Sequence, residues 1–393
     1  MEKALSKILS TVAVCGLATS AWSLTIVPTF DSSITSDPNS AAMIAGINAA
    51  IQDFQTNYTD SLTVRIQFVN DTSISLGQSS TWSSDYTYAG YVAAIRSTAT
   101  SVNDANALGT LPNSATDPVI GNTNIRLTLP LARLTGLDTG YGPDGFDATI
   151  RLNMPLMNLT RPPTNSGNYD LIAVAEHEID EVLGTSSSLP SVSILRPVDL
   201  FRYDTNLNRT FTTSGDNAYL SVDGVNLWAR YNMNSGGDYA DWWSFTGYWA
   251  PNGATPHAQV QDAFGSAGTV QDLGTNEFTT LDIIGYTLAV VTPPPTLAIV
   301  VSGPGQVALS WATNVTGYAL QESANLSLGS WVPSATGSTN PAIVMASGTQ
   351  KYYELKKSPA PSIALENPLV VQRSTNPSLK LDTIIFRPRS GPR

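Results

Sequence analysis

The chain has 393 residues, of which 42% are hydrophobic and only 13% are charged, and its formal net charge is −11. This length allows more than one domain, and the hydrophobic fraction is enough to build a core. The acidic balance disfavours nucleic acid and anionic lipid as partners, because like charges repel.

Residues 1–23 have the pattern of a signal peptide. Lysines precede an apolar run from Ile8 to Ala18, and Ala21-Trp22-Ser23 follows it. The run is too short for a lasting membrane anchor, and no later segment reads as a transmembrane span. We therefore expect cleavage near Ser23 and a secreted or cell-surface protein. The single cysteine, Cys15, lies inside this segment, so the rest of the chain has no thiol for a disulfide or a metal.

Residues 24–290 alternate between strand-like and helix-like patterns. Apolar residues at helical spacing mark the helices, and alternating residues mark the strands. The predicted elements are a strand at Leu24–Phe30, a helix at Ser40–Tyr58, a strand at Leu62–Val69, a helix at Tyr86–Thr98 and a strand at Phe146–Asn153. This order predicts an α+β domain with a mixed sheet packed on helices.

A further helix is predicted from Tyr169 to Leu183, with Asn168 as its N-cap and Gly184 as its stop. It contains the sequence HEIDE, beginning at His177. In such a helix His177 and Glu181 share one face at i, i+4, and Glu178 lies about 100° away.

The C-terminal part begins with a proline-rich linker at 291–295. Strand-like runs separated by Gly, Asn and Ser then recur through 296–357, which predicts a small antiparallel β-sandwich. The last stretch, 358–393, is rich in proline and basic residues, and its sequence assigns it no fold.

The HEIDE sequence differs from the zinc-binding motif H-E-x-x-H by one ligand. In that motif two histidines hold the metal and the glutamate is the general base. His177 and Glu178 are in place, and Glu181 takes the second ligand position. Carboxylate oxygen is an accepted zinc ligand. Its charge weakens the Lewis acid, so we expect Zn²⁺ or another divalent metal and a slower enzyme.

The third ligand is not fixed by the motif. In the pattern H-E-x-x-H-x-x-G-x-x-H the third histidine would fall on Ser187, which is a poor ligand. The other histidine of the chain, His257, is one alternative, Asp241 is another, and Asp199 is a weaker one. A metal-free alternative is a solvated acidic helix face with an incidental histidine.

Several segments together resemble secreted bacterial metalloproteases of the zincin superfamily. The matching segments are HEIDEVLG at 177–184, DLFRY at 199–203, AYLSVDG at 218–224, GGDYADW at 236–242, VQDAFG at 260–265 and LDIIGY at 281–286. The resemblance spans most of residues 24–290 and implies a zincin-like catalytic domain. Relatives with an intact motif have Ser-His-Trp where this chain has Ala240-Asp241-Trp242, which implies that Asp241 is the third ligand. The run 297–355 loosely resembles modules for surface display, which implies cell-surface association.

The leading hypothesis is an exported metal-dependent endopeptidase acting on protein or peptide substrates. Its metal ligands would be His177, Glu181 and Asp241, with His257 as the alternative, and Glu178 would be the general base. The second hypothesis is a catalytically degenerate scaffold that binds peptides or glycans through a tryptophan cluster. That cluster comprises Trp242, Trp243 and Trp249.

Overall fold

The computed structural model forms two compact units. The first comprises Met1–Ala289 together with Val371–Arg393, and the second comprises Val290–Val370. The described residues are 24–215, 217–244, 259–289, 296–312, 318–324, 331–345, 351–357 and 372–389. The predicted signal segment 1–23, the linker 291–295 and His257 lie outside the described residues.

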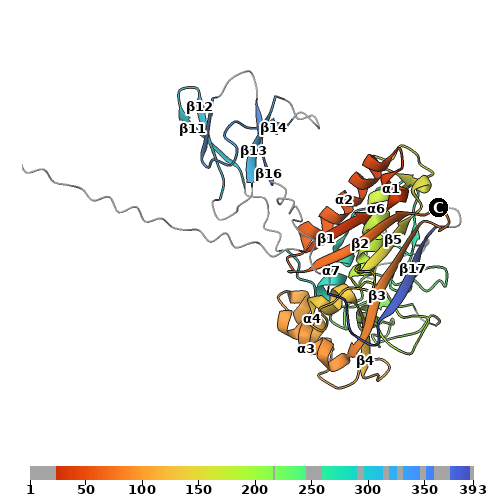
Figure 1. The fold of residues 1–393 in the computed structure, drawn as a ribbon. Helices are drawn as coiled ribbons and strands as arrows, with labels where there is room; N and C mark the ends of the chain where they lie inside the picture. The colour runs from red at the N-terminus through yellow and green to blue at the C-terminus, as the bar shows by residue number, and fades with distance from the viewer. Residues whose placement is uncertain are drawn as a thin grey trace, which may run out of the picture. The chain divides into compact units, whose positions relative to one another are not determined.

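The first unit is built on a mixed seven-stranded sheet (Figure 1). Its order is β1-β2-β5-β3-β17-β10, and β4 also pairs with β3. Strands β1, β2 and β5 are parallel, whereas β3 is antiparallel to β5, β4 and β17. The bounds are β1 Thr25–Phe30, β2 Thr63–Asn70, β3 Gly77–Thr87, β4 Asn124–Thr128, β5 Ala148–Leu152, β10 Phe264–Gly265 and β17 Lys380–Pro388. Short two-stranded sheets pair β6 (Met157–Asn158) with β7 (Tyr169–Asp170) and β8 (Arg202–Tyr203) with β9 (Tyr219–Leu220).

The strands follow two different sequence patterns. In β2, Val64, Ile66 and Phe68 are buried and alternate with half-buried residues, as a strand with one covered face requires. Strand β3 (GQSSTWSSDYT) instead buries serine, threonine and glycine. Its hydrogen-bonding side chains therefore face the interior beside the helix that carries HEIDE.

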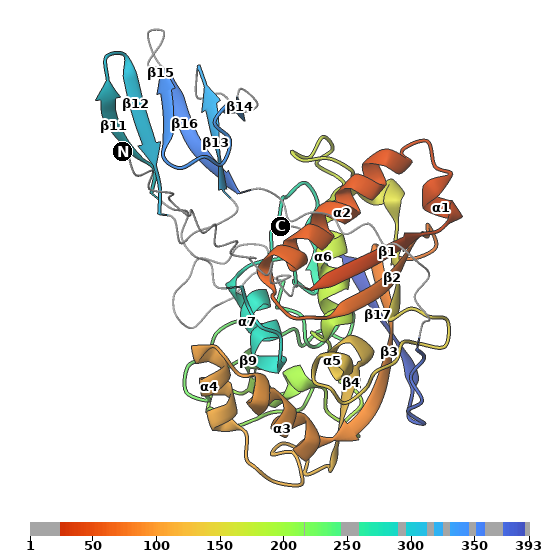
Figure 2. The same ribbon diagram turned by 60° about the vertical axis from the view of Figure 1, so that its left-hand side comes forward.

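Helices cover the sheet, and α6 lies deepest (Figures 1 and 2). Helix α6 contacts β3 and β5, and α2 packs along α6. The bounds are α1 Ser32–Thr35, α2 Ser40–Asn57, α3 Tyr88–Thr98, α4 Val102–Thr110, α5 Leu129–Leu134, α6 Leu171–Leu183 and α7 Thr275–Ile284, with 3₁₀ turns at Met154–Leu156 and Pro197–Phe201. Among the described residues, no helix combines the length and apolarity that crossing a membrane requires.

The ends of α6 are set by two residues. Asp170 is the N-cap, because its side chain accepts a hydrogen bond from the Ile172 amide at 3.2 Å. The predicted cap, Asn168, lies two residues too early and is wrong. Gly184 ends the helix at φ 140°, a conformation that a residue with a Cβ rarely adopts.

The C-terminal segment is part of the first unit, which changes the predicted domain division. Residues 358–393 had no fold assigned from sequence, yet Lys380–Pro388 form β17 between β3 and β10. Figure 1 shows this blue strand beside the orange β3. The second unit is therefore inserted between two parts of the first.

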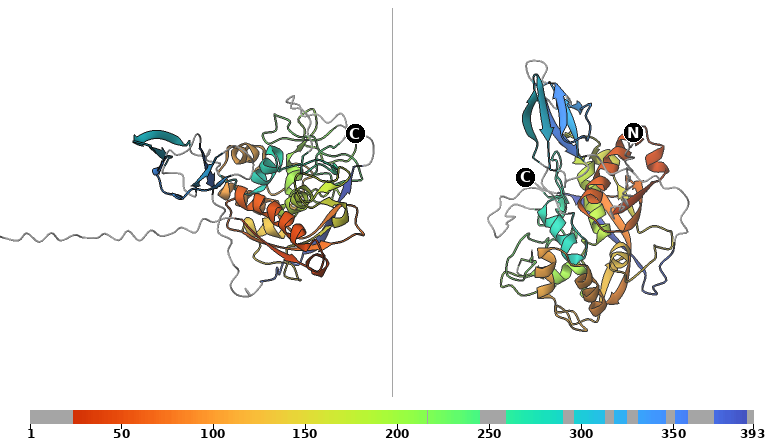
Figure 3. Two further views of the ribbon diagram at one scale, coloured as in Figure 1. Left: turned by 90° about the horizontal axis from the view of Figure 1, so that it is seen from above. Right: turned by 90° about the vertical axis from the view of Figure 1, so that its left-hand side faces the viewer.

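The second unit consists of two three-stranded antiparallel sheets (Figure 3). One has the order β11-β12-β15 and the other β14-β13-β16. Their bounds are β11 Ala298–Gly303, β12 Gln306–Ser310, β13 Tyr318–Ser323, β14 Val332–Pro333, β15 Ala342–Met345 and β16 Tyr352–Lys357. Leu309, Trp311, Leu320 and Ala342 form one small buried cluster. The chain is thus α+β, with a mixed sheet and several small antiparallel sheets.

Candidate metal centre

The acidic residues of α6 are buried. His177 and Glu178 are 0% exposed and Glu181 is 1% exposed. A solvated acidic face would leave such groups in water, where ionisation costs nothing. The burial therefore contradicts the metal-free reading of a surface helix, because a carboxylate removed from water needs a compensating partner.

Three side chains converge at one point beside α6. The Nε2 atom of His177 lies 3.4 Å from Oε1 of Glu181 and 3.9 Å from Oδ2 of Asp241. One ligand atom from each residue lies within 4.8 Å of the other two. Ligands held about 2.1 Å from a tetrahedral ion lie about 3.4 Å apart. The spacing of His177 and Glu181 matches this value, and the three residues together could hold a metal ion.

The imidazole of His177 is oriented for such a role. Its Nδ1 lies 2.9 Å from the carbonyl oxygen of Val260. A carbonyl can only accept, so Nδ1 carries the proton and the lone pair of Nε2 is directed at the cluster. Phe386 of β17 stacks on the ring, with centroids 3.9 Å apart and an interplanar angle of 15°.

Each carboxylate of the cluster is held through one oxygen. Ser79 of β3 donates its hydroxyl to Oε2 of Glu181 at 2.5 Å, and Oε1 of Glu181 has no hydrogen-bond partner. Gln261 donates its side-chain amide to Oδ1 of Asp241 at 3.1 Å. The second oxygen of each carboxylate therefore remains available for a cation.

Glu178 is buried beside this cluster with neither carboxylate oxygen hydrogen-bonded by a side chain or backbone group. It lies against Gly77 of β3: a Cβ built on Gly77 would be 2.2 Å from its Oε1. The missing side chain at Gly77 makes the space for the carboxylate. Glu178 is thus a buried carboxyl group next to the three converging ligands.

The buried acidic groups of the cluster shift one another's pKa values in the direction that a nearby positive charge would oppose. Burial raises the pKa of Glu178 and of Asp241 well above their usual values, and the charge of Glu181 adds to this. Burial alone would lower the pKa of His177, but Asp241 and Glu181 raise it to about 9. Burial and then Glu181 raise the pKa of Asp238 to about 7.

The other candidate ligands are not brought to this point. Asp199 accepts hydrogen bonds from the Ser187 hydroxyl at 2.5 Å and from the Arg196 amide at 2.9 Å, and closes a turn. Ser187, at the third-histidine position of the longer motif, therefore supports a loop and offers the cluster no ligand. The alternative His257 lies outside the described residues.

Of the described tryptophans in the predicted cluster, Trp242 is buried and Trp243 is half-buried. Trp242 is 1% exposed, packs on Tyr231 and donates its indole N–H to Glu277 at 3.0 Å. Trp243 is contacted by the Arg230 guanidinium, 4.0 Å from its ring centroid. Trp249 is outside the described residues.

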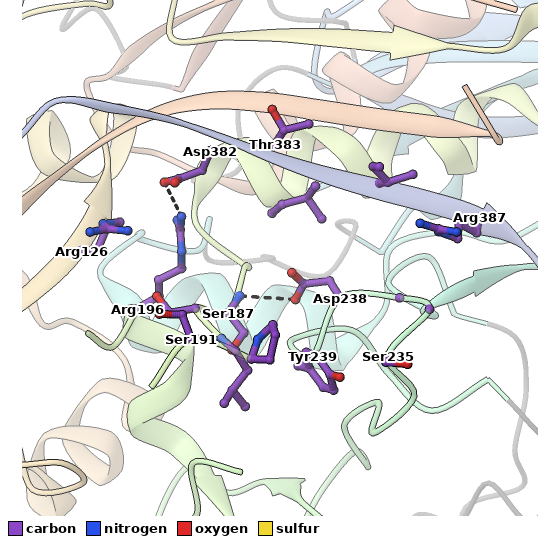
Figure 4. A pocket seen from close by; sticks show the side chains of 17 residues that line it. Arg126, Ser187, Ser191, Arg196, Ser235, Asp238, Tyr239, Asp382, Thr383 and Arg387 are labelled. Carbon is purple, nitrogen blue, oxygen red and sulfur yellow. Dashed lines mark hydrogen bonds and ion pairs between the residues drawn. The ribbon is translucent and has the colours of Figure 1, made fainter. Parts of the chain in front are cut away.

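A cavity of about 410 Å³ lies next to the cluster, beneath β17 (Figure 4). Asp382 and Thr383 of β17 form one side, and Asp238 and Tyr239 form the other. His177, Glu178 and Glu181 are not among its lining residues. Asp238 lines the cavity, and its pKa is raised first by burial and then by the charge of Glu181.

Four supporting residues had no recognisable signal in the sequence. Ser79 and Gly77 lie on a strand with no apolar alternation, and Phe386 lies on a segment without a predicted fold. Gln261 belongs to VQDAFG, which was singled out only by resemblance. In each case the contact joins segments far apart in the chain, such as the 102-residue separation of Ser79 and Glu181.

Comparison with known proteins found no matching family model, no matching curated protein and no matching solved structure. The functional inference consequently depends on the arrangement of this chain's own residues.

Proposed function

We propose that the protein is an exported, metal-dependent endopeptidase of zincin type, with the centre formed by His177, Glu181 and Asp241. The observation that carries the proposal is the convergence of three ligand atoms within 4.8 Å, in a buried place, beside the unpaired carboxylate of Glu178. A structural metal site needs the three ligands alone. The free carboxylate adjacent to them is what a hydrolytic site additionally needs.

In this proposal each residue has a separate task. His177, Glu181 and Asp241 hold the ion, and Ser79 and Gln261 keep the two carboxylates in place. A bound divalent ion would supply a more acidic water and polarise the scissile carbonyl. Glu178 would take a proton from water and pass it to the leaving amine.

The donor set constrains the metal. One imidazole and two carboxylates suit Zn²⁺, and such an oxygen-rich set also suits other divalent ions such as Mn²⁺. Two anionic ligands lower the positive charge left on the ion. A modest turnover rate is therefore expected.

Hydrolysis of labelled casein by metal-loaded Glu178→Gln protein tests the role of the base. We expect the variant to retain its metal and to lose activity by at least about 100-fold, the lower end of the range for a general base. Glu176→Gln is the matched control, since Glu176 is on the same helix and equally buried and unpaired. Undiminished hydrolysis by the Glu178 variant would refute the role.

One observation favours a second candidate, a non-catalytic scaffold that binds peptide. The three ligands are at most 2% exposed, so a substrate has no direct path to them in this conformation. Under that alternative the metal-loaded protein binds peptides, and neither Glu178→Gln nor the unaltered chain hydrolyses them.

A further inference from the structure

One strand that contacts the centre, β17, comes from the far end of the chain. Gly77, Ser79 and Thr81 of β3 are paired with Phe386, Ile384 and Asp382 of β17, in antiparallel register. The second unit, 81 residues long, separates β17 from the rest of the first unit. An antiparallel strand on a sheet edge is also how many proteins bind an extended peptide in trans.

We propose that Lys380–Pro388, here called the strap, occupies the peptide-binding edge of β3 and keeps the protein in a latent form. An extended peptide reaches the His177 centre only when the strap leaves that edge. This inference rests on the proposed function, because it assumes that the centre acts on a peptide.

The strap buries few side chains for a strand inside a sheet, although its backbone pairs with β3 at seven positions and with β10 at two. Phe386 is its one buried side chain, whereas β2 buries three in alternation. Leu381 is 52% exposed and Ile385 is 37% exposed. Asp382–Ile385 line the open pocket of about 410 Å³ (Figure 4). Removing the strap would therefore expose little apolar core apart from the site of Phe386.

Side-chain contacts add to the backbone pairing of the strap with β3. Lys380 binds Asp85 at 3.0 Å and the hydroxyls of Thr383 and Ser80 lie 3.0 Å apart, and two further contacts lie at the centre and at the cavity. Phe386 covers the face of the His177 ring at 3.9 Å. Asp382 accepts hydrogen bonds from Arg196 and Ser83, and the pair with Arg196 is the dashed contact beside the cavity in Figure 4. One anchor thus covers the centre itself, and the other closes over the cavity next to it. The same movement would uncover both.

A peptide-binding measurement tests the strap independently of hydrolysis. The probe is a fluorescent synthetic peptide copying residues 378–389, and the protein is the full chain loaded with Zn²⁺. The strap competes with the probe, so the apparent affinity is reduced by the small fraction of open molecules. Phe386→Ala should increase affinity for the probe by about 100-fold, because truncating a buried Phe costs the closed state heavily. Ile385→Ala, on the neighbouring exposed position, should resemble the unaltered chain.

A reversible disulfide crosslink between β3 and the strap provides a second test of the proposal. Ser80 and Thr383 face each other with their hydroxyl oxygens 3.0 Å apart, and paired strand positions are close enough for a disulfide. The substitutions Ser80→Cys and Thr383→Cys are introduced together into the Phe386→Ala chain. Cys15→Ser is included in each of these proteins, so that the two new cysteines are the only thiols. Oxidation should abolish probe binding, and reduction by a phosphine should restore it.

Equal binding by the oxidised and reduced proteins would overturn the proposal, as would Phe386→Ala binding the probe no better than the unaltered chain. If Phe386→Ala does not fold, as judged by circular dichroism, Asp382→Asn takes its place and should bind the probe at least about 10-fold more tightly than the unaltered chain. Probe binding without casein hydrolysis in any protein would uphold the strap while refuting the endopeptidase.

Discussion

Replacing Glu176 by glutamine should stabilise the protein, and the gain should grow with pH. Glu176 is 0% exposed, and neither carboxylate oxygen has a hydrogen-bond partner. Burial first, and then a side-chain interaction with Asp53 outside ideal hydrogen-bond geometry, raises its pKa from 4.5 to about 10. The charges acting on it are those of Asp53, Arg161 and Asp272, which do not belong to the metal cluster.

The sign and size of the change in the free energy of unfolding follow from proton linkage. An acid with a raised pKa in the folded state favours folding below its unfolded pKa, and this contribution is lost as pH rises toward the folded pKa. Between pH 4.5 and pH 7, folding must take up a proton at a cost of about 1.36 kcal/mol per pH unit, or about 3 kcal/mol at pH 7. Glutamine needs no proton and is close in shape to the protonated acid.

Urea unfolding followed by tryptophan fluorescence, at several values from about pH 5 to about pH 8, measures the difference between the two proteins. The expected gain is below about 1 kcal/mol at pH 5 and up to about 3 kcal/mol at pH 7. Asp71→Asn is the control, because hydrogen bonds from Ser73 lower the pKa of that exposed acid. A Glu176→Gln difference that does not change with pH would refute the reasoning.

Three further predictions concern the centre. Ser79→Ala removes the donor to Glu181 and should weaken Zn²⁺ affinity by about 10–100-fold, as measured by competition with a chromogenic chelator. Gly77→Ala would place a Cβ 2.2 Å from the Glu178 carboxylate, so it should lower hydrolysis while metal content stays constant; unchanged hydrolysis would show that Glu178 is not confined there. Removing the metal with EDTA should lower the melting temperature of the loaded chain, and Zn²⁺ at about 1,000 times its Kd should restore about 4 kcal/mol. An identical melting curve with and without EDTA would contradict the last of these.

The parts of the fold that sequence predicts are those with local apolar periodicity. Strand β2 and helices α2 and α6 were expected almost at their observed bounds, because alternation or helical spacing marks which residues are buried. Strand β3 buries Ser79 and Ser83, so its sequence has no hydrophobic signal. Strand β17 pairs with residues 303 positions away, as between Ser80 and Thr383, and local pattern carries no information about such a partner.

The sequence also predicts only part of the candidate site. The helical spacing of His177 and Glu181 predicts that they share a face, and the structure brings them within 3.4 Å. Asp241 was preferred to His257 only through the family resemblance. The distance between Asp241 and α6 depends on the loops that connect them, which the sequence pattern does not determine. The burial of the whole cluster under Phe386 could not be foreseen, since it requires knowledge of where the last strand lies.

The central claim is that His177, Glu181 and Asp241 hold one divalent ion. Anomalous diffraction at the zinc edge, from crystals of the Zn²⁺-loaded chain, tests it most directly. We predict a single strong peak within about 2.0–2.3 Å of Nε2 of His177, Oε1 of Glu181 and Oδ2 of Asp241. A peak at other residues, or none in protein that has been given excess zinc, would contradict the claim.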